Sequence, residues 1–219
     1  MSSPAHTAIV LIDPYNDFLH PSGQLHPLLA ASLAAKNTLA HLQTLVSTAR
    51  AQSLPIYYGL HQQTHPGFLA GWKHASPLQE SQKASVAFEE GSWGVEVFGG
   101  LEPDVGGGDV VVSKHWSSSS FQNTDLDYQL RQRDITNLVF GGLTANTCLE
   151  STARYAYELK FGWGNKSLPV FESRGYHVTM LSDCTAGFTK KATDAATELI
   201  WPLFAHEVMT VEEWKKSIA

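Results

Sequence analysis

The chain has little of what marks a secreted, membrane-spanning or nucleic-acid-binding protein. It has two cysteines in 219 residues, too few for a disulfide framework. Lys and Arg total 15 against 21 Asp and Glu, and the net charge of −6 argues against nucleic-acid binding. The apolar run at 8–12 is too short to cross a membrane, and no basic start with a following apolar run opens the sequence. We therefore expect a cytoplasmic protein with free thiols that binds neither membranes nor nucleic acid.

What is present is the pattern of a globular α/β protein. Hydrophobic residues make up 43% and charged residues 16%, which is typical of a folded chain. The expected strands are 8–12, 55–59, 110–112, 138–140, 177–181 and 207–210, and the expected helices are 28–51, 125–133, 148–159 and 190–204. This alternation predicts a single domain over 1–219 with a three-layer α/β/α, Rossmann-like architecture and a mainly parallel six-stranded sheet. Residues 61–108 do not fit the pattern and form a long functional loop in this interpretation, while 161–175 is an expected exposed insertion.

Cys148 is the first candidate for a catalytic residue. It follows an apolar strand and a glycine pair, and it opens a segment with helical apolar spacing. At a helix N-terminus, free backbone N–H groups and the helix dipole stabilise a thiolate, which is the nucleophilic form. The same N–H groups can hold the oxyanion of an attacked carbonyl. The alternative is a small buried thiol that packs a strand–helix junction. Cys184, at a strand end, is expected to be buried and inert.

Two further reactive residues follow predicted strands. Asp13 ends the first strand and Lys114 follows the third. Ligands bind at the carboxyl ends of parallel strands, so both side chains are expected to meet Cys148 in one crevice. Asp13 would then take the thiol proton, while Lys114 would hold Asp13 ionised and lower the thiol pKa. Taken singly, each is also explained by an ordinary turn or a solvated strand end.

Five sequence segments together resemble the isochorismatase-like cysteine hydrolases, which include nicotinamidases, N-carbamoylsarcosine and ureidoacrylate amidohydrolases, and isochorismatase. The matching segments are Ile9-Val-Leu-Ile-Asp13-Pro-Tyr-Asn16-Asp17-Phe18, Val112-Ser-Lys114-His-Trp, Phe121-Gln-Asn-Thr124-Asp-Leu126-Asp, Gly141-Gly-Leu-Thr-Ala-Asn-Thr-Cys148-Leu-Glu-Ser-Thr-Ala and Val178-Thr-Met-Leu-Ser-Asp183-Cys-Thr-Ala-Gly187. The resemblance covers nearly the whole chain except 61–108 and 161–175.

The resemblance implies a catalytic triad of Asp13, Lys114 and Cys148. It also implies a cis peptide bond between Leu143 and Thr144, and an oxyanion hole made by the amides of Thr144 and Cys148. Family members form a thioester with the substrate, and the cysteine here favours C–N hydrolysis of a small amide, ureide or carbamoyl compound. Relatives assemble as dimers or tetramers, so a homo-oligomer is expected.

Three alternatives remain at this stage. One is the vinyl ether hydrolysis of isochorismate, in which Asp13 would protonate the substrate. Another is a non-catalytic, partner-binding member of the fold. The third, a flavodoxin-like nucleotide-binding domain, would need a phosphate-cradling loop after a strand, where this chain has Pro14-Tyr-Asn.

Several further residues are expected near the site. Residues that follow the strand ends or lie in the long loop are predicted to contact the substrate: Asn16, Phe18, Trp93, Trp116, Phe121 and Leu143. His115 is expected to point to the other side of the sheet from Lys114. The nicotinamidase branch binds a metal through an Asp and histidines after the second strand. This chain has His61, His65 and His74 there without that Asp, so we predict neither a metal nor a cofactor.

Overall fold

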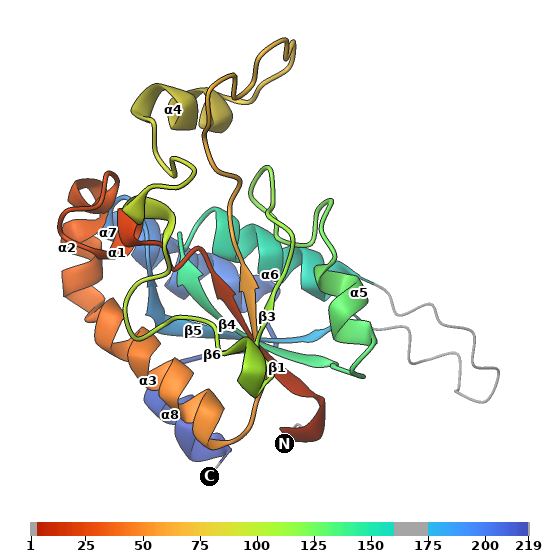
Figure 1. The fold of residues 1–219 in the computed structure, drawn as a ribbon. Coiled ribbons are helices and arrows are strands. Elements are labelled where there is room, and N and C mark those ends of the chain that lie inside the picture. Colours follow the sequence, from red (N-terminus) through yellow and green to blue (C-terminus); the bar gives the residue numbers. More distant parts are fainter. Residues whose placement is uncertain (1–3, 160–174, 219) are drawn as a thin grey trace.

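Six parallel strands form the centre of the molecule, in the order β3-β2-β1-β4-β5-β6 (Figure 1). This computed structural model describes residues 4–159 and 175–218. The strands are β1 (Thr7–Ile12), β2 (Ile56–Gly59), β3 (Val110–Val111), β4 (Asn137–Leu143), β5 (His177–Ala186) and β6 (Glu207–Met209). Every residue of β1 and β2 is buried, as expected for central parallel strands covered on both faces. The predicted six-stranded parallel sheet is confirmed.

Helices cover both faces of this sheet. They are α1 (Asn16–Leu19), α2 (His26–Lys36), α3 (Thr38–Ala51), α4 (Pro77–Ser85), α5 (Leu126–Arg131), α6 (Cys148–Glu158), α7 (Lys190–Asp194) and α8 (Val211–Ser217). One apolar core joins α2, α3 and α8 to the first face, and a second joins α5 and α6 to the other. The predicted three-layer α/β/α architecture is therefore confirmed. Among the described residues, no helix combines the length and apolar character needed to cross a membrane.

Two of the predicted helices differ from those observed. The helix expected at 28–51 is two helices, because Asn37 adopts a left-handed conformation with φ 48° that interrupts the helical hydrogen bonding. The helix expected at 190–204 is α7 followed by a π-helical turn at Ala195–Ile200 and a 3₁₀ turn at Trp201–Leu203. The expected insertion at 161–175 lies almost wholly outside the described residues.

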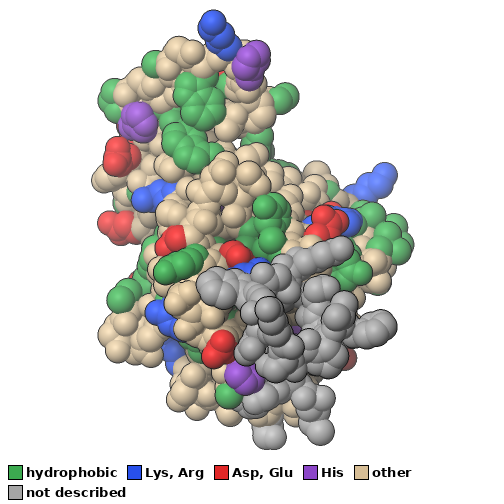
Figure 2. Space-filling view, turned by 90° about the vertical axis from the view of Figure 1, so that its right-hand side faces the viewer, with side chains coloured by type: hydrophobic (Ala, Val, Ile, Leu, Met, Phe, Trp, Pro, Cys, Tyr) green, Lys and Arg blue, Asp and Glu red, His purple; other side chains and the backbone are tan. Residues whose placement is uncertain are grey.

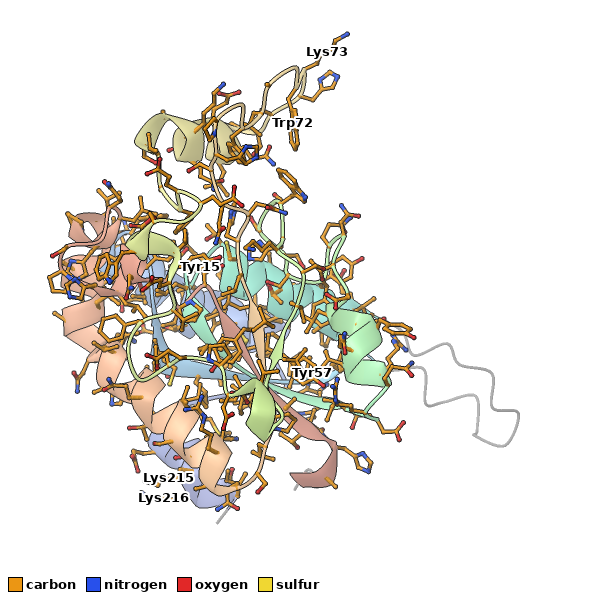
Figure 3. All side chains as sticks on the ribbon, in the orientation of Figure 1. Tyr15, Tyr57, Trp72, Lys73, Lys215 and Lys216 are labelled. Carbon is orange, nitrogen blue, oxygen red and sulfur yellow. The ribbon has the colours of Figure 1, made fainter. Side chains whose placement is uncertain are left out.

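Part of the long loop forms a projection beyond the carboxyl ends of the strands. We call residues 62–88 the projecting segment; it carries α4 and lies on the opposite side of the molecule from both termini (Figure 1). Its base is closed by two backbone hydrogen bonds of 2.8 Å between Thr64 and residues 88 and 90. Trp72 and Lys73 lie at its tip (Figure 3), and hydrophobic side chains gather on its surface (Figure 2). The segment therefore stands above the edge of the sheet where ligands bind in this architecture.

Candidate active site

Asp13 lies directly after β1, and its backbone is unusual. Its φ of 48° is in the left-handed region, which few residues other than glycine adopt. Its amide donates to the carbonyl of Gly59 over 2.9 Å, which fixes the chain at the end of β2. On the other side, Gly142 of β4 has φ 117°, and a Cβ there would lie 2.1 Å from the carbonyl oxygen of Ile12. Only glycine therefore allows β4 to approach β1 this closely beside Asp13.

The carboxylate of Asp13 is buried, and only one of its oxygens is hydrogen-bonded. Oδ1 accepts the backbone N–H of His61 over 2.7 Å and lies 3.3 Å from Nε2 of His115. Oδ2 is equally buried and has no hydrogen-bond partner in the described part of the chain. An unpaired buried carboxylate oxygen is costly, so it marks a position where a proton or a ligand is expected to bind.

His115 contacts an acceptor through each of its ring nitrogens. Nδ1 lies 2.6 Å from the carbonyl oxygen of Ser117, which can only accept, so Nδ1 carries a hydrogen. An ionised Asp13 also only accepts, so the contact at Nε2 assigns a second hydrogen there. Burial alone would lower the pKa of His115, but the Asp13 carboxylate and its hydrogen bond outweigh this effect and raise that pKa above 6.5. The contacts of both ring nitrogens and the raised pKa together favour the imidazolium form of His115 beside Asp13.

His61 completes the surroundings of this pair without carrying charge. Burial lowers its pKa, and the nearby His115 lowers it further, although Asp13 opposes both effects. Tyr15, at the base of the projecting segment (Figure 3), donates its hydroxyl to the carbonyl of His61 over 2.9 Å. This bond holds the His61 backbone in place, so that its N–H points at Asp13.

Cys148 begins α6, as predicted, and meets Asp13 at the edge of the sheet. One ligating atom from each of Asp13, His115 and Cys148 lies within 4.8 Å of the other two, and all three residues are buried. Burial, followed by the charge of Asp13, raises the pKa of the Cys148 thiol well above its usual range. This differs from the low pKa expected from the helix N-terminus, because loss of hydration and a facing carboxylate both disfavour the thiolate. The resting residue is therefore a thiol.

Lys114 occupies a different environment from the one predicted. It is half-buried, and within the described residues no ion pair joins its ammonium to Asp13. The expectation that His115 points away from the site is wrong. β3 ends at Val111, which pairs with Tyr58, and the next pairing, the isolated bridge of His115 with His61, is shifted by one residue. The strand-end rule therefore found the right region but not the residue that contacts the carboxylate.

The segment before Cys148 forms the floor of the site. The Leu143–Thr144 peptide bond is cis. The hydroxyl of Thr144 is hydrogen-bonded to that of Thr147, which in turn donates to Sγ of Cys148 over 3.9 Å. Because Cys148 is the first residue of α6, its amide is among those without an intrahelical acceptor.

A cavity of about 70 Å³ opens onto these groups. Its lining is Asp13, Phe18, Leu25, His61, Leu78, Ser81, Gln82, Ser85, Ala87, Phe88, Thr144, Thr147, Cys148 and Phe188. Half of these residues come from His61 and the projecting segment, so α4 forms one wall and the sheet edge the other. A single water needs ~10–15 Å³ of such space, so the volume holds only a small group.

Gln82 is the notable polar residue of the α4 wall. It is 6% exposed, and its Nε2 donates to the carbonyl of Gln62 over 2.8 Å. Its Oε1 is buried and has no partner among the described residues. Nearby, Gln79 donates to the carbonyl of Trp116 over 3.0 Å and so ties α4 to the chain that follows Lys114. Gln82 therefore brings a buried, unpartnered acceptor to the α4 wall of the cavity.

Of the six residues predicted to contact substrate, Phe18 lines this cavity. The other five do not belong to its described lining. Asn16 is buried and donates to the carbonyl of Trp93, which is exposed and packs on His20; Trp116 stacks on Phe68, Phe121 stacks on Tyr155, and Leu143 lies in the core. The contributions of Gln82, Phe88 and Phe188 were missed.

The histidines considered for a nicotinamidase-like metal site do not adopt a helical arrangement. His61 and His65 lie in irregular chain, and Nδ1 of each lies 3.0 Å from the carbonyl of the following residue. His61 and His65 are four residues apart and could bind one zinc ion together only on a helix, and that arrangement is not formed. The histidine that joins a cluster of potential ligands is His115.

Comparison with known proteins places this site in a family. A family model described as the isochorismatase domain matches residues 7–163. The chain belongs to the isochorismatase family. A ureidoacrylate amidohydrolase (RutB) of Agrobacterium fabrum is 29% identical over 168 residues, covering 72% of this chain and 72% of that protein. This isochorismatase-family protein is therefore a hydrolase.

Solved structures share its fold. A cysteine hydrolase from Pseudomonas syringae pv. phaseolicola superposes with a TM-score of 0.70 at 24% identity, covering 99% of this chain and 94% of that one. An N-carbamoylsarcosine amidase from Thermoplasma acidophilum gives a TM-score of 0.59 at 24% identity, covering 93% and 95%. At these identities the likeness establishes the fold of the isochorismatase-family protein and leaves its substrate open.

Proposed function

We propose that the protein hydrolyses a C–N bond of a small amide, ureide or carbamoyl compound, with Cys148 as nucleophile and Asp13 as base. The observation that carries the proposal is the meeting of a buried thiol and a carboxylate with an unpartnered oxygen at one cavity. This is the arrangement of a nucleophile with an adjacent base. The resemblance of the sequence to amidohydrolases of the family supports the same chemistry.

In the proposed reaction, Asp13 takes the Cys148 proton as the sulfur attacks the substrate carbonyl. The raised thiol pKa fits proton transfer during the attack rather than a thiolate that waits in the resting site. The C–N bond then breaks, and the amine leaves with the proton held by Asp13. Water, deprotonated by Asp13, attacks the thioester, and the acid leaves as the thiol is restored.

Positive charge beside Asp13 comes from two residues in this proposal. His115 contacts the Asp13 carboxylate over 3.3 Å and places a positive charge beside it in its imidazolium form. Lys114, the triad member implied by the family resemblance, directly precedes His115 in the chain. Its flexible four-carbon side chain can bring the ammonium to the site in the substrate complex. The amides of Thr144 and Cys148 hold the oxyanion, supported by the place of both residues in the cavity lining.

The cavity favours a substrate that carries an N–H group. An amide or ureide can donate to the unpartnered Oε1 of Gln82, which restores a hydrogen bond that the buried oxygen lacks. The described lining contains no Lys or Arg, whereas isochorismate carries two carboxylates. Amide or ureide hydrolysis is thus better supported than vinyl ether hydrolysis.

Turnover with trapping of the intermediate tests the proposal. Purified protein would be supplied with ureidoacrylate, N-carbamoylsarcosine, nicotinamide and neutral alkyl ureas, with ammonia release as the readout. We expect release with at least one of these compounds and an acyl adduct on the Cys148 peptide by mass spectrometry. Cys148→Ala should abolish turnover, while the matched Cys184→Ala variant, which changes the other buried thiol, should retain it. Turnover that survives Cys148→Ala would refute the mechanism, and no turnover with any compound would favour a partner-binding role.

A further inference from the structure

Asp13, His115 and Cys148 have the geometry of a metal site. One oxygen, one nitrogen and one sulfur atom lie within 4.8 Å of each other, on three residues distant in sequence and all buried. Two ligands that each lie ~2.0–2.1 Å from a tetrahedral zinc are ~3.4 Å apart. The 3.3 Å between Nε2 of His115 and Oδ1 of Asp13 already matches this spacing. The sulfur of Cys148 lies within 4.8 Å of both other ligand atoms, so it can supply a third ligand.

Two further observations support a ligand at the centre of this trio. Oδ1 of Asp13 accepts from the His61 amide, while Oδ2 is buried and unpartnered on a residue that is 1% exposed, so the carboxylate lacks a partner that a cation would supply. The carbonyl of Ser117 accepts from Nδ1 of His115 over 2.6 Å, which directs Nε2 to the site. A carbonyl that orients a histidine in this way is a recurring outer contact of zinc ligands.

We propose that Asp13, His115 and Cys148 bind a thiophilic divalent cation of the zinc type, and that this cation inhibits the enzyme by occupying the nucleophile and the base. Thiolate, imidazole and carboxylate together suit zinc or cobalt better than magnesium or calcium, which prefer oxygen ligands alone. The inhibitory role rests on the proposed hydrolase function, whereas the binding site itself does not.

Binding involves no redox change. Bonds form from the metal to Sγ of Cys148, Nε2 of His115 and an oxygen of Asp13, and a water fills the fourth position. The thiol proton and the proton between His115 and Asp13 are released to solvent. Affinity should therefore increase as the pH rises, because both protons compete with the metal.

Cobalt is the first probe, because a cobalt–thiolate bond gives a charge-transfer absorption that other ligands do not. Reduced, chelator-treated protein would be titrated with Co²⁺, followed by displacement with Zn²⁺. We expect one cobalt per chain with a thiolate band in the wild type and in Cys184→Ser, the control for the other buried cysteine. Cys148→Ser should lose the band, and His115→Gln should weaken cobalt binding by about tenfold or more. His65→Gln, which changes an exposed histidine, should bind as the wild type does.

The outcomes separate this inference from the proposed function. No thiolate band in the wild type, or a band that survives Cys148→Ser, overturns the site whether or not the protein turns over a substrate. Cys148→Ser is nearly isosteric and keeps the test valid if His115→Gln fails to fold, which circular dichroism would reveal. Where turnover is found, Zn²⁺ should suppress it and a chelator should restore it. Activation by Zn²⁺ would overturn the inhibitory role.

Discussion

Replacing His115 and Lys114 separately identifies which cation is the resting partner of Asp13. Both variants, His115→Gln and Lys114→Gln, exchange a basic side chain for the same neutral amide one residue apart. The His115–Asp13 pair has side chains that are 0% and 1% exposed, so its loss leaves an uncompensated buried charge. Breaking a buried pair in this way costs ~3–5 kcal/mol. Lys114 is half-buried and makes no ion pair in the described chain, so we expect its replacement to cost at most ~1 kcal/mol.

Urea unfolding measures the difference. For a chain of this size the slope is ~3 kcal/mol per molar urea, so His115→Gln should lower the midpoint by ~1–2 M near neutral pH, and Lys114→Gln by only a few tenths. Activity should show the opposite contrast for the lysine, since Lys114→Gln is expected to lose turnover while it keeps most of its stability. A Lys114→Gln variant that unfolds more readily than His115→Gln would refute the assignment of the ion pair.

The pH dependence of stability gives a second reading of the same pair. The pKa of His115 is raised in the folded state above the unfolded value near 6.5. Its stabilising contribution is therefore complete below about pH 6.5 and is lost as the pH rises through the folded-state pKa. The gap in unfolding free energy between the wild type and His115→Gln should accordingly narrow as the pH rises above about 6.5. A gap that widens over this range would contradict a charged His115.

Three further predictions concern the cavity and the strands below it. Gly142→Ala should cost at least ~3 kcal/mol in thermal or urea unfolding, because a Cβ would lie 2.1 Å from the Ile12 carbonyl oxygen; Gly91→Ala, also at positive φ but with nothing within 4 Å, should cost only ~1 kcal/mol. Gln82→Met should raise KM about five- to tenfold for a substrate with an N–H donor and change kcat less, since one hydrogen bond is worth ~1 kcal/mol; an unchanged KM would dismiss the contact. Iodoacetamide should label resting Cys148 more slowly at about pH 7 than a free cysteine, because burial and Asp13 raise the thiol pKa; rapid labelling at about pH 6 would contradict that direction.

The sheet was predictable because its central strands are short apolar runs between turn signals. β1 and β2 are buried along their whole length, so their sequences contain no alternation to misinterpret. The strand-end rule then placed Asp13 and Cys148 together, since both follow neighbouring parallel strands. Three helices were not predicted, α1, α4 and α8, although signals existed for the last two. Ser76 with Gln79, and Thr210 with Glu213, form capping boxes at the starts of α4 and α8.

The contacts of the site were less predictable, because they depend on chain without regular structure. His115 reaches Asp13 only because β3 stops after two residues and the pairing then shifts by one residue, from Tyr58 with Val111 to His61 with His115. No alternation rule applies over such a stretch. Likewise, Gln82 lies 69 positions from Asp13 along the sequence (82 − 13), and only the return of the projecting segment brings it to the cavity. The local sequence pattern does not show that the projecting segment brings Gln82 back to the cavity.

The two walls of the cavity come from different parts of the fold. The sheet edge carries the residues proposed to react with the substrate, and α4 carries residues that can select it. The sheet edge holds Asp13 and Cys148 through contacts that tolerate little change, such as the close approach of Gly142 to β1. The opposite wall is α4, which is tied down by Gln79 and Gln82 through backbone carbonyls rather than through particular partner side chains. Bonds to carbonyls survive most substitutions of the residues that carry them. Ser81 and Leu78 can therefore vary without moving the helix, and the cavity can change its ligand while the thiol and the carboxylate keep their geometry.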